Sequence, residues 1–220
     1  MPSRRFRRPR RAAIAAAMAL SACAAFAATF DSVDFFRAVN VDNADAVSRM
    51  LAAGLDPNQA DPRGQPALLV ALQGESLKVA QVLLDAKGIQ VDVRNHAGET
   101  PLMMAALKGE VDAAAALVAH GAAVKKDGWS PLHYAATGGS APIVKLLLSK
   151  GAALEARSPN GSTPLMMAAR YGNENAVDAL LAAGADRTAK NDLGMDASAF
   201  AASAGREKLA ARLKSGGAGR

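Results

Sequence analysis

The residue types best suited to metal binding or nucleophilic catalysis are scarce in this chain, which has three histidines and one cysteine among 220 residues. A zinc site needs several converging His, Cys or carboxylate ligands. His96, His120 and His133 stand instead in three different settings: a loop tip, the end of one helix and the start of another. No serine or cysteine has the neighbouring base that an activated nucleophile requires. We therefore expect no enzymatic activity, no metal and no cofactor.

The formal net charge of +6 comes from the first eleven residues. Six arginines lie there without an acidic residue, and the remaining 20 basic side chains equal the 20 acidic ones in number. Nucleic-acid binding depends on basic side chains that neutralise phosphates, so we expect no nucleic-acid partner. Half of the residues are apolar but only 4% are aromatic, which predicts a core of Ala, Leu, Val and Met.

Residues 1–27 have the pattern of a cleaved signal peptide. The arginine cluster precedes an apolar stretch from Ala12 to Ala22, which is shorter than the roughly 20 residues that span a bilayer. Ala25-Phe26-Ala27 then supplies small residues where a signal peptidase needs them. We predict cleavage after Ala27 and a mature chain that is periplasmic or secreted.

The single cysteine supports a second interpretation. Leu20-Ser21-Ala22-Cys23 resembles the bacterial lipoprotein box, in which the cysteine is lipidated and becomes the new N-terminus. A lipid on Cys23 would then be the one membrane attachment that we expect. Both interpretations place the mature chain outside the cytoplasm of a bacterium, and the choice between them stays open.

Two series of glycines indicate an internal repeat. The first runs through Gly54, Gly88, Gly121, Gly151 and Gly184, at intervals of 34, 33, 30 and 33 residues. The second runs through Gly64, Gly98, Gly128, Gly161 and Gly194, at intervals of 34, 30, 33 and 33 residues. A unit of about 33 residues is therefore repeated, with three residues missing from the loop between Gly121 and Gly128.

The segments after the second glycine of each unit match one another. Gly98-Glu-Thr-Pro-Leu-Met-Met-Ala-Ala, Gly128-Trp-Ser-Pro-Leu-His-Tyr-Ala-Ala and Gly161-Ser-Thr-Pro-Leu-Met-Met-Ala-Ala align without a gap. A second apolar pair follows fifteen residues after the first leucine of each copy, for example Leu147-Leu148. This arrangement predicts two short helices in each unit, which bury their apolar faces only by stacking on the next unit.

These motifs resemble the ankyrin repeat over about residues 30–214. The resemblance implies an all-α solenoid of helix-turn-helix units with capping repeats at both ends. The implied units are about 30–61, 62–94, 95–126, 127–157, 158–190 and 191–214, within an ankyrin-repeat domain of residues 28–214. Residues 215–220 are rich in glycine and are predicted to form a disordered tail.

The ends of the predicted helices carry residues that commonly start or end a helix. A hydroxyl side chain precedes proline at the start of each first helix, where it can accept a backbone N–H and where the proline needs no N–H. These hydroxyl residues are Thr100, Ser130 and Thr163. We expect each first helix to end at a glycine, as helices commonly do: Gly109, Gly139 and Gly172. In the last unit, Arg206, Lys208, Arg212 and Lys214 are predicted to point outward.

Four side chains near the start of the first helices lead to specific predictions. The resemblance places His133 where it bonds the hydroxyl of Ser130, and the methionines at the same position, Met103 and Met166, are expected to remove that local hydrogen bond. Trp129 is either an exposed interface anchor or a side chain that packs over the shortened loop. Both alternatives stay open.

Ankyrin-repeat proteins bind partners through their loop tips and the exposed side of their first helices, and the resemblance carries this over to twelve residues. The loop-tip residues are Arg63, Gln65, His96, Glu99, Lys126, Trp129, Asn160 and Ser162, and the first-helix residues are Lys108, Tyr134, Arg170 and Tyr171.

The sequence therefore predicts a non-catalytic protein-binding module of the cell envelope. It would bind a folded protein through its concave face and loop tips, for example as an immunity or accessory protein for a secreted enzyme. The alternative is a lipid-anchored envelope protein with a structural or small-ligand-binding role. Partner identity does not follow from architecture.

Overall fold

The computed structural model of the protein describes residues 31–215. The predicted signal peptide, with Cys23 and Ala27, lies outside the described residues, as do residues 216–220 of the predicted tail. The described range holds twelve helices and no named strand, only an isolated β-bridge between Ala60 and Pro66. The predicted all-α fold class is confirmed.

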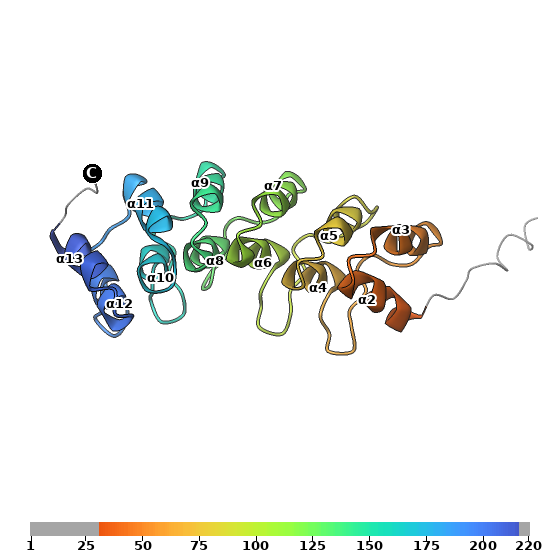
Figure 1. The fold of residues 1–220 in the computed structure, drawn as a ribbon, viewed down its shortest axis with the longest axis horizontal. Coiled ribbons are helices and arrows are strands. Elements are labelled where there is room, and N and C mark those ends of the chain that lie inside the picture. Colours follow the sequence, from red (N-terminus) through yellow and green to blue (C-terminus); the bar gives the residue numbers. More distant parts are fainter. Residues whose placement is uncertain (1–30, 216–220) are drawn as a thin grey trace, which may run out of the picture.

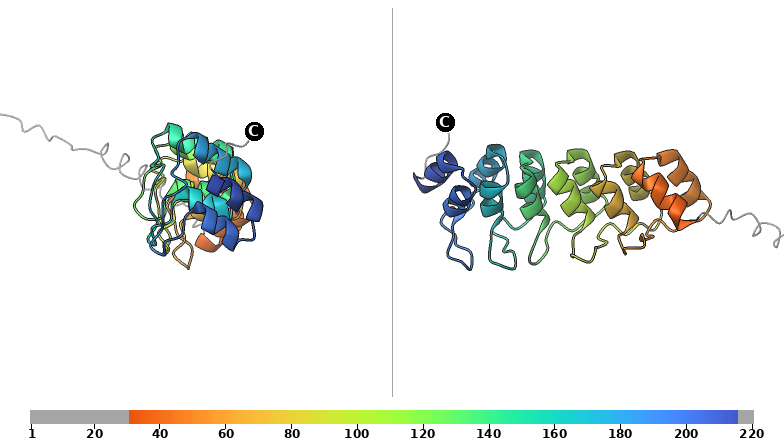
Figure 2. Two further views of the ribbon diagram at one scale, coloured as in Figure 1. Left: turned by 90° about the vertical axis from the view of Figure 1, so that its left-hand side faces the viewer. Right: turned by 60° about the horizontal axis from the view of Figure 1, so that its bottom comes forward.

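The helices form six pairs, one in each unit that the glycine spacing predicts. The pairs from α2–α3 to α10–α11 stand side by side in one row, with the first helices along one side and the second helices along the other (Figure 1). The loops that connect successive units project together to one side (Figure 2, right). The pairs are α2 (Ser32–Asn40) and α3 (Ala44–Ala52), α4 (Ala67–Gln73) and α5 (Leu77–Leu84), α6 (Pro101–Lys108) and α7 (Val111–Ala119), α8 (Pro131–Gly138) and α9 (Ala141–Ser149), α10 (Pro164–Arg170) and α11 (Glu174–Ala182), and α12 (Ala197–Ser203) and α13 (Glu207–Ser215).

A leucine from each helix of the internal units builds the shared core. Every one of these side chains is at most 1% exposed, and helices of two turns cannot bury so much apolar surface without neighbours on both sides. Stacking is therefore what stabilises the units. The leucines are Leu68, Leu102, Leu132 and Leu165 in the first helices and Leu83, Leu117, Leu147 and Leu180 in the second.

Threonine caps two of the first helices as predicted. Oγ1 of Thr100 accepts the backbone N–H of Met103 at 3.4 Å, and Oγ1 of Thr163 accepts that of Met166 at the same distance. At the start of α8 the cap hydroxyl bonds to a side chain: Oγ of Ser130 lies 2.9 Å from Nδ1 of His133. The predicted bond between the histidine and the cap hydroxyl is thus present.

Met103 and Met166 keep one of the two bonds that His133 makes in its cap, the one with the backbone N–H and not the one with the hydroxyl. The backbone N–H of Thr100 donates to Sδ of Met103 at 3.3 Å, and that of Thr163 donates to Sδ of Met166 at 3.3 Å. In the fourth unit Nδ1 of His133 accepts the same kind of bond from Ser130 N at 3.2 Å. A polarisable thioether is a weak acceptor, so it replaces the imidazole nitrogen in the cap.

The glycines that end the first helices have two different reasons to be glycine. Gly139 has a φ of +76°, the left-handed conformation that favours glycine after a helix. Gly172 does not end α10 in this way, since the cap is Tyr171. A Cβ on Gly172 would instead overlap the carbonyl oxygen of Ala136 in the preceding unit, so this glycine permits close packing of α10 on α8.

The last unit is attached by two arginines that the sequence prediction placed outward. Nη1 of Arg206 donates to three carbonyl oxygens at the end of α10, those of Ala168, Ala169 and Gly172, at 2.8–3.0 Å. Arg212 is only 21% exposed and lies 2.9 Å from Asp178 and 3.4 Å from Glu174 on α11. The outward prediction is wrong for these two, because Arg206 bonds to carbonyls at a helix end and Arg212 to nearby carboxylates of the unit before it.

The first two units are joined by a side chain as well as by packing. Asp42 follows α2 with a φ of +52°, a conformation that Asp tolerates better than most residues. Its Oδ1 accepts the backbone N–H of Val79, in the first turn of α5, at 2.9 Å. Asp42 therefore supplies a cap for a helix of the following unit.

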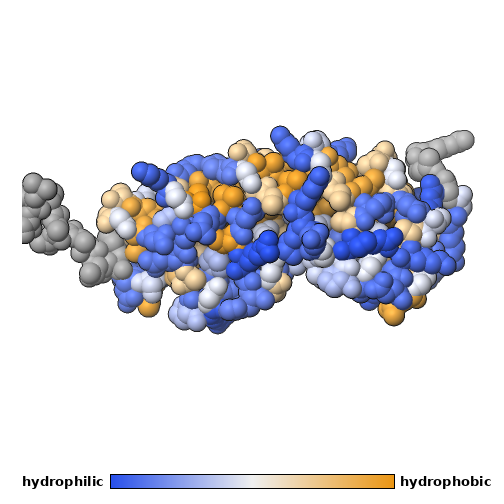
Figure 3. Space-filling view, turned by 180° about the vertical axis from the view of Figure 1, so that it is seen from behind, coloured by the Kyte–Doolittle hydropathy of each residue, from blue (hydrophilic) through white to orange (hydrophobic). Residues whose placement is uncertain are grey.

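On the back of the molecule, apolar and polar residues occupy two lengthwise halves. Seen from behind, apolar residues gather along the half where the second helices lie, and polar residues cover the half below them (Figure 3). No helix in the described part of the chain is long and apolar enough to cross a membrane.

Candidate functional site

The predicted partner-binding residues lie at the first helices and on the loops between units. These loops project together to one side (Figure 2). Eleven of the twelve keep accessible surface. Five are exposed, namely Arg63, His96, Asn160, Lys108 and Tyr171, and six are half-buried, namely Gln65, Glu99, Lys126, Trp129, Tyr134 and Arg170. We call Leu107, Lys108, Tyr134, Arg170 and Tyr171 the first-helix face.

Ser162 is the exception and corrects the prediction. It is only 1% exposed, its backbone N–H donates to Oγ of Ser158 at 3.0 Å, and its own Oγ has no partner among the described residues. Glu99 and Trp129 at the same place in other units are long enough to emerge, whereas a serine side chain stays beneath the surface. Ser162 is therefore not available to a partner.

Lys108 forms an ion pair with the preceding unit. Its Nζ lies 2.9 Å from Oε1 of Glu75. Glu75 takes the place that Gly109 and Gly139 hold in the next units, and it adopts a φ of +57°. Exposed ion pairs contribute at most about 1 kcal/mol, so the main result is a neutralised charge at this end of the face.

Tyr134 also bonds to the unit before it. Its hydroxyl donates to Oε1 of Glu99 at 2.8 Å, and Nδ2 of Asn95 donates to Oε2 of the same carboxylate at 2.7 Å. Burial, then the hydrogen bond to Glu99 and its charge, raise the pKa of the Tyr134 phenol well above its ordinary value. Tyr134 stays neutral and acts as a fixed donor to Glu99.

Arg170 and Tyr171 form a stacked pair at the end of α10. The guanidinium carbon of Arg170 lies 5.1 Å from the centroid of the Tyr171 ring, a geometry in which the cation is attracted to the aromatic face. Tyr171 is 57% exposed. This pair combines a positive charge with a large accessible aromatic surface.

Trp129 packs against the core at the start of the shortened unit. Its ring meets the ring of His133 edge to face, with centroids 5.4 Å apart, and its carbonyl oxygen accepts from Nζ of Lys126 at 3.3 Å. The ring is half-buried. The packing interpretation thus accounts for the buried part of Trp129, while the rest of the ring stays accessible.

His133 is fully buried and spans two units. Its Nδ1 faces Ser130, and its Nε2 lies 3.0 Å from the carbonyl oxygen of Ser162. Burial lowers the pKa of His133, and backbone hydrogen bonds offset part of the change. The structure therefore gives this histidine a role in packing between units.

Two pairs of neighbouring loop tips are joined by hydrogen bonds. Nε2 of His96 lies 3.1 Å from the carbonyl oxygen of Arg63, and the backbone N–H of Asp192 donates to the carbonyl oxygen of Asn160 at 3.2 Å. These bonds fix the two loops of each pair relative to one another, so the exposed side chains of each pair have a defined arrangement.

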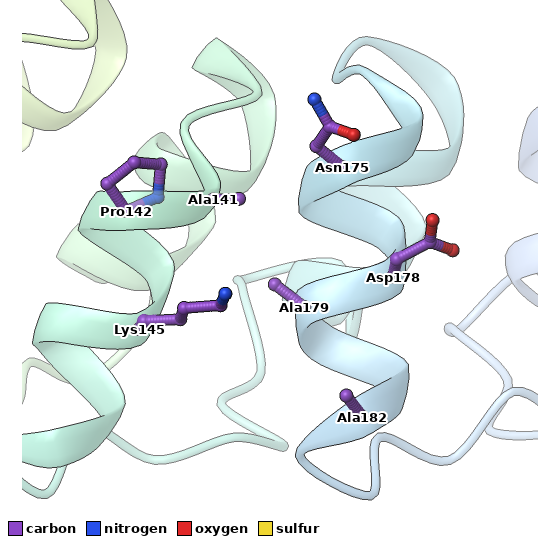
Figure 4. Close-up of a pocket in the computed structure, with 7 residues that line it drawn as sticks. All are labelled: Ala141, Pro142, Lys145, Asn175, Asp178, Ala179 and Ala182. Atoms are coloured by element: carbon purple, nitrogen blue, oxygen red, sulfur yellow. The ribbon is translucent and has the colours of Figure 1, made fainter.

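A groove of about 650 Å³ lies between the second helices α9 and α11, away from the predicted face. Lys145 extends into it from α9, whereas Asp178 on α11 points to the other side (Figure 4). The rest of its wall is mainly alanine, with Pro142 and Asn175. It brings together no acid–base pair, and no group of three His, Cys, Asp or Glu residues within 31–215 is placed to hold a metal.

Two contributors to the first-helix face were missed in the sequence. Leu107 is 36% exposed and occupies the same place in its unit as Arg170, so aligning the units by their glycines could have found it. Glu75 could have been found by asking what replaces the glycine of the other units.

The chain resembles proteins of known architecture along most of its length. A family model described as "Ankyrin repeats (3 copies)" matches residues 35–126, 87–158, 121–191 and 152–218. An ankyrin repeat domain from Acinetobacter baumannii AYE has a similar solved structure, with a TM-score of 0.70 and 25% sequence identity, covering 84% of this chain and 99% of that one.

Curated relatives match over a shorter stretch. The B-cell lymphoma 3 protein homolog of Mus musculus is 34% identical over 125 residues, which are 54% of this chain and 28% of that protein. Neurogenic locus notch homolog protein 2 of Homo sapiens is 35% identical over 118 residues, which are 52% of this chain and 5% of that protein. The matched region thus spans less than a third of the length of either relative.

Proposed function

The chain belongs to the ankyrin-repeat family, whose repeats are generally protein–protein interaction modules, and on this premise we propose that it is a non-catalytic protein-binding module of the cell envelope. It binds a folded partner through the concave side of its first helices and through its loop tips. The observation that carries this proposal is the first-helix face, where Lys108 and Tyr134 are fixed by bonds to the preceding unit and Tyr171 remains exposed.

A fixed surface favours binding because little conformational entropy is lost when the partner docks. Tyrosine and arginine are also the residue types that dominate the binding energy of interfaces. A specific form of the proposal is that the partner is a secreted enzyme, which this protein inhibits or escorts as an immunity or accessory protein. Its support is the predicted export of the chain.

Affinity capture from a periplasmic extract tests the proposal. The wild-type protein, Trp129→Ala and Tyr171→Ala serve as baits, and Lys150→Ala, an exposed change on the second-helix side, serves as the control. One partner should be recovered by the wild type and the control and lost or reduced with the other two baits. Equal recovery by all four would show that this face does not bind it.

The cellular location is part of the proposal. Cleavage after Ala27 gives a periplasmic or secreted chain, whereas lipidation of Cys23 gives a membrane-anchored lipoprotein with a structural or small-ligand-binding role as the alternative function. Mass spectrometry of the mature N-terminus separates these outcomes, because Ala28 and a diacylated Cys23 differ in mass. An unprocessed Met1 in the purified envelope fraction would contradict both.

A further inference from the structure

We propose that the first-helix face recognises an acidic peptide segment, and that Arg170, held by Tyr171, binds its carboxylate. This inference rests on the proposed function and adds the chemistry of the partner. It follows from the state of Arg170, from the charges around it and from the surface beside it.

Arg170 has no polar partner among the described residues, although it is half-buried. Three other arginines are bonded to neighbouring units: Arg157 donates to two carbonyl oxygens, Arg206 to three, and Arg212 contacts two carboxylates. The guanidinium carbon of Arg170 lies over the ring of Tyr171, 5.1 Å from its centroid. Its N–H donors are therefore available to a ligand.

The stacking on Tyr171 prepares Arg170 for binding. A guanidinium is a planar fork that matches the two oxygens of a carboxylate. An arginine that already rests on an aromatic ring loses less rotational freedom when it binds, so more of the interaction energy appears as affinity. Tyr171 plays a positioning role and also offers its own exposed surface.

Lys108, the other charged residue of the first-helix face, and Glu99 on the neighbouring loop tip already have partners. Nζ of Lys108 pairs with Glu75 at 2.9 Å, and the carboxylate of Glu99 accepts bonds from Tyr134 and Asn95. Arg170 is the remaining charged residue of this face without an opposite charge or hydrogen bond in the described chain. Electrostatic complementarity thus calls for a negative group opposite Arg170.

The surroundings indicate what accompanies the negative group. Gly138 lies between the units of Leu107 and Tyr171 and presents no side chain, while Leu107 is 36% and Tyr171 is 57% exposed. The exposed apolar surface of Leu107, two units before the free arginine, and of Tyr171, next to it, fits an Asp or Glu accompanied by apolar residues. Phosphopeptide recognition uses clusters of arginine. This face has a single arginine, which favours a carboxylate over a phosphate as its ligand.

A random dodecapeptide library displayed on phage tests the inference with the full chain as bait. Peptides selected on the wild type should be enriched in Asp and Glu over the unselected library. Selection on Arg170→Glu should lose this enrichment and shift toward Lys and Arg. The control is Lys150→Glu, an equal change of charge on the second-helix side, which should leave the acidic enrichment intact.

Individual synthetic peptides then measure the contribution of each residue. An acidic peptide from the wild-type pool should bind Arg170→Glu and Arg170→Ala about tenfold or more weakly, the loss expected for a central interface residue. Arg170→Lys should restore only part of the affinity, because an ammonium lacks the fork. Matching thermal unfolding of all variants shows that the fold is unchanged.

The outcomes separate this inference from the proposed function. The selected peptides could lack acidic enrichment and yet bind Tyr171→Ala and Leu107→Asp more weakly than the wild type. That result would overturn the role of Arg170 and leave the face intact. Peptides insensitive to both of these changes would contradict the face as well. A wild-type selection that yields no peptide above background would overturn the inference, since a preformed acidic-peptide site must enrich its ligands.

Discussion

The imidazole of His133 joins two neighbouring units, because its Nε2 lies 3.0 Å from the carbonyl oxygen of Ser162. A carbonyl oxygen only accepts, so Nε2 carries the proton and Nδ1 is left to accept from the backbone N–H of Ser130 at 3.2 Å. Protonation of Nδ1 would break its bond with the backbone N–H of Ser130 and leave only the hydroxyl of Ser130, 2.9 Å away, to accept from it in the buried core.

This arrangement predicts that stability falls in mild acid. The pKa of His133 is lowered in the folded protein from an ordinary value near 6.5, so below about pH 6.5 the unfolded chain binds a proton that the folded chain does not. The free energy of unfolding should then fall by up to about 1.4 kcal/mol for each pH unit until the folded pKa is reached. Urea unfolding at pH 7.5 and 5.5 measures the change.

His133→Met provides the comparison, because Met103 and Met166 stand at the same position in the adjacent units. This variant should lose most of the difference between pH 7.5 and 5.5, while His96→Gln should keep it. An acid-induced decrease of equal size in wild type and His133→Met would contradict the assignment.

Arg206 should stabilise the last unit through the three carbonyl oxygens that it binds at the end of α10. Arg206→Met keeps much of the aliphatic packing but removes the donors, and we expect a loss of about 2 kcal/mol, typical of hydrogen bonds to a charged group. Lys208→Met, an exposed change in the same unit, should alter the urea midpoint little. Equal midpoints for the two variants would show that the carbonyls are satisfied without Arg206.

Gly138 and Gly74 occupy the same place in their units and should respond differently to alanine. A Cβ on Gly138 would overlap the carbonyl oxygen of Leu107, whereas the nearest atom to a Cβ on Gly74 is the carbonyl oxygen of Val70 at 3.3 Å. Gly138→Ala should therefore destabilise the protein by about 1–3 kcal/mol, as overpacking does, and Gly74→Ala by clearly less. Thermal unfolding of the pair is the measurement, and a smaller effect at Gly138 than at Gly74 would contradict the close contact of α6 and α8.

The last loop tip lacks an acceptor that the third unit has. Nδ2 of Asn191 is buried without a partner among the described residues, whereas Nδ2 of Asn95 donates to Glu99 at 2.7 Å. Met195 stands where Glu99 does, so Met195→Glu should supply the missing acceptor and exceed Met195→Leu in stability by about 1 kcal/mol. If the leucine variant proves the more stable in urea, packing of this side chain outweighs the unsatisfied amide.

The sequence predicted the architecture well because its signals are local and recur. Threonine followed by proline starts α6 and α10, and the buried leucines fall in the same register in each unit. A periodic pattern of this kind specifies helices and their stacking without knowledge of any single contact.

The site was less predictable because it depends on side-chain length and on contacts between units. Ser162 was placed on the surface by its register, yet a short side chain there is buried. The pattern predicts that Arg206 faces solvent, whereas it bonds to carbonyl oxygens of the unit before it. The charge of a side chain and its position in the repeat do not tell whether it bonds to the neighbouring unit. That depends on which groups the neighbouring unit presents in the folded protein.

Because Oδ1 of Asp42 accepts the backbone N–H of Val79, the first unit protects the start of α5 in the second unit. When the first helix pair frays, α5 loses a cap, so opening at this end of the solenoid should spread inward rather than stop at the boundary. Hydrogen exchange at the Val79 amide would then report the opening of a unit to which that amide does not belong. The exchange rate of this one amide therefore measures how far unfolding spreads along the row of units.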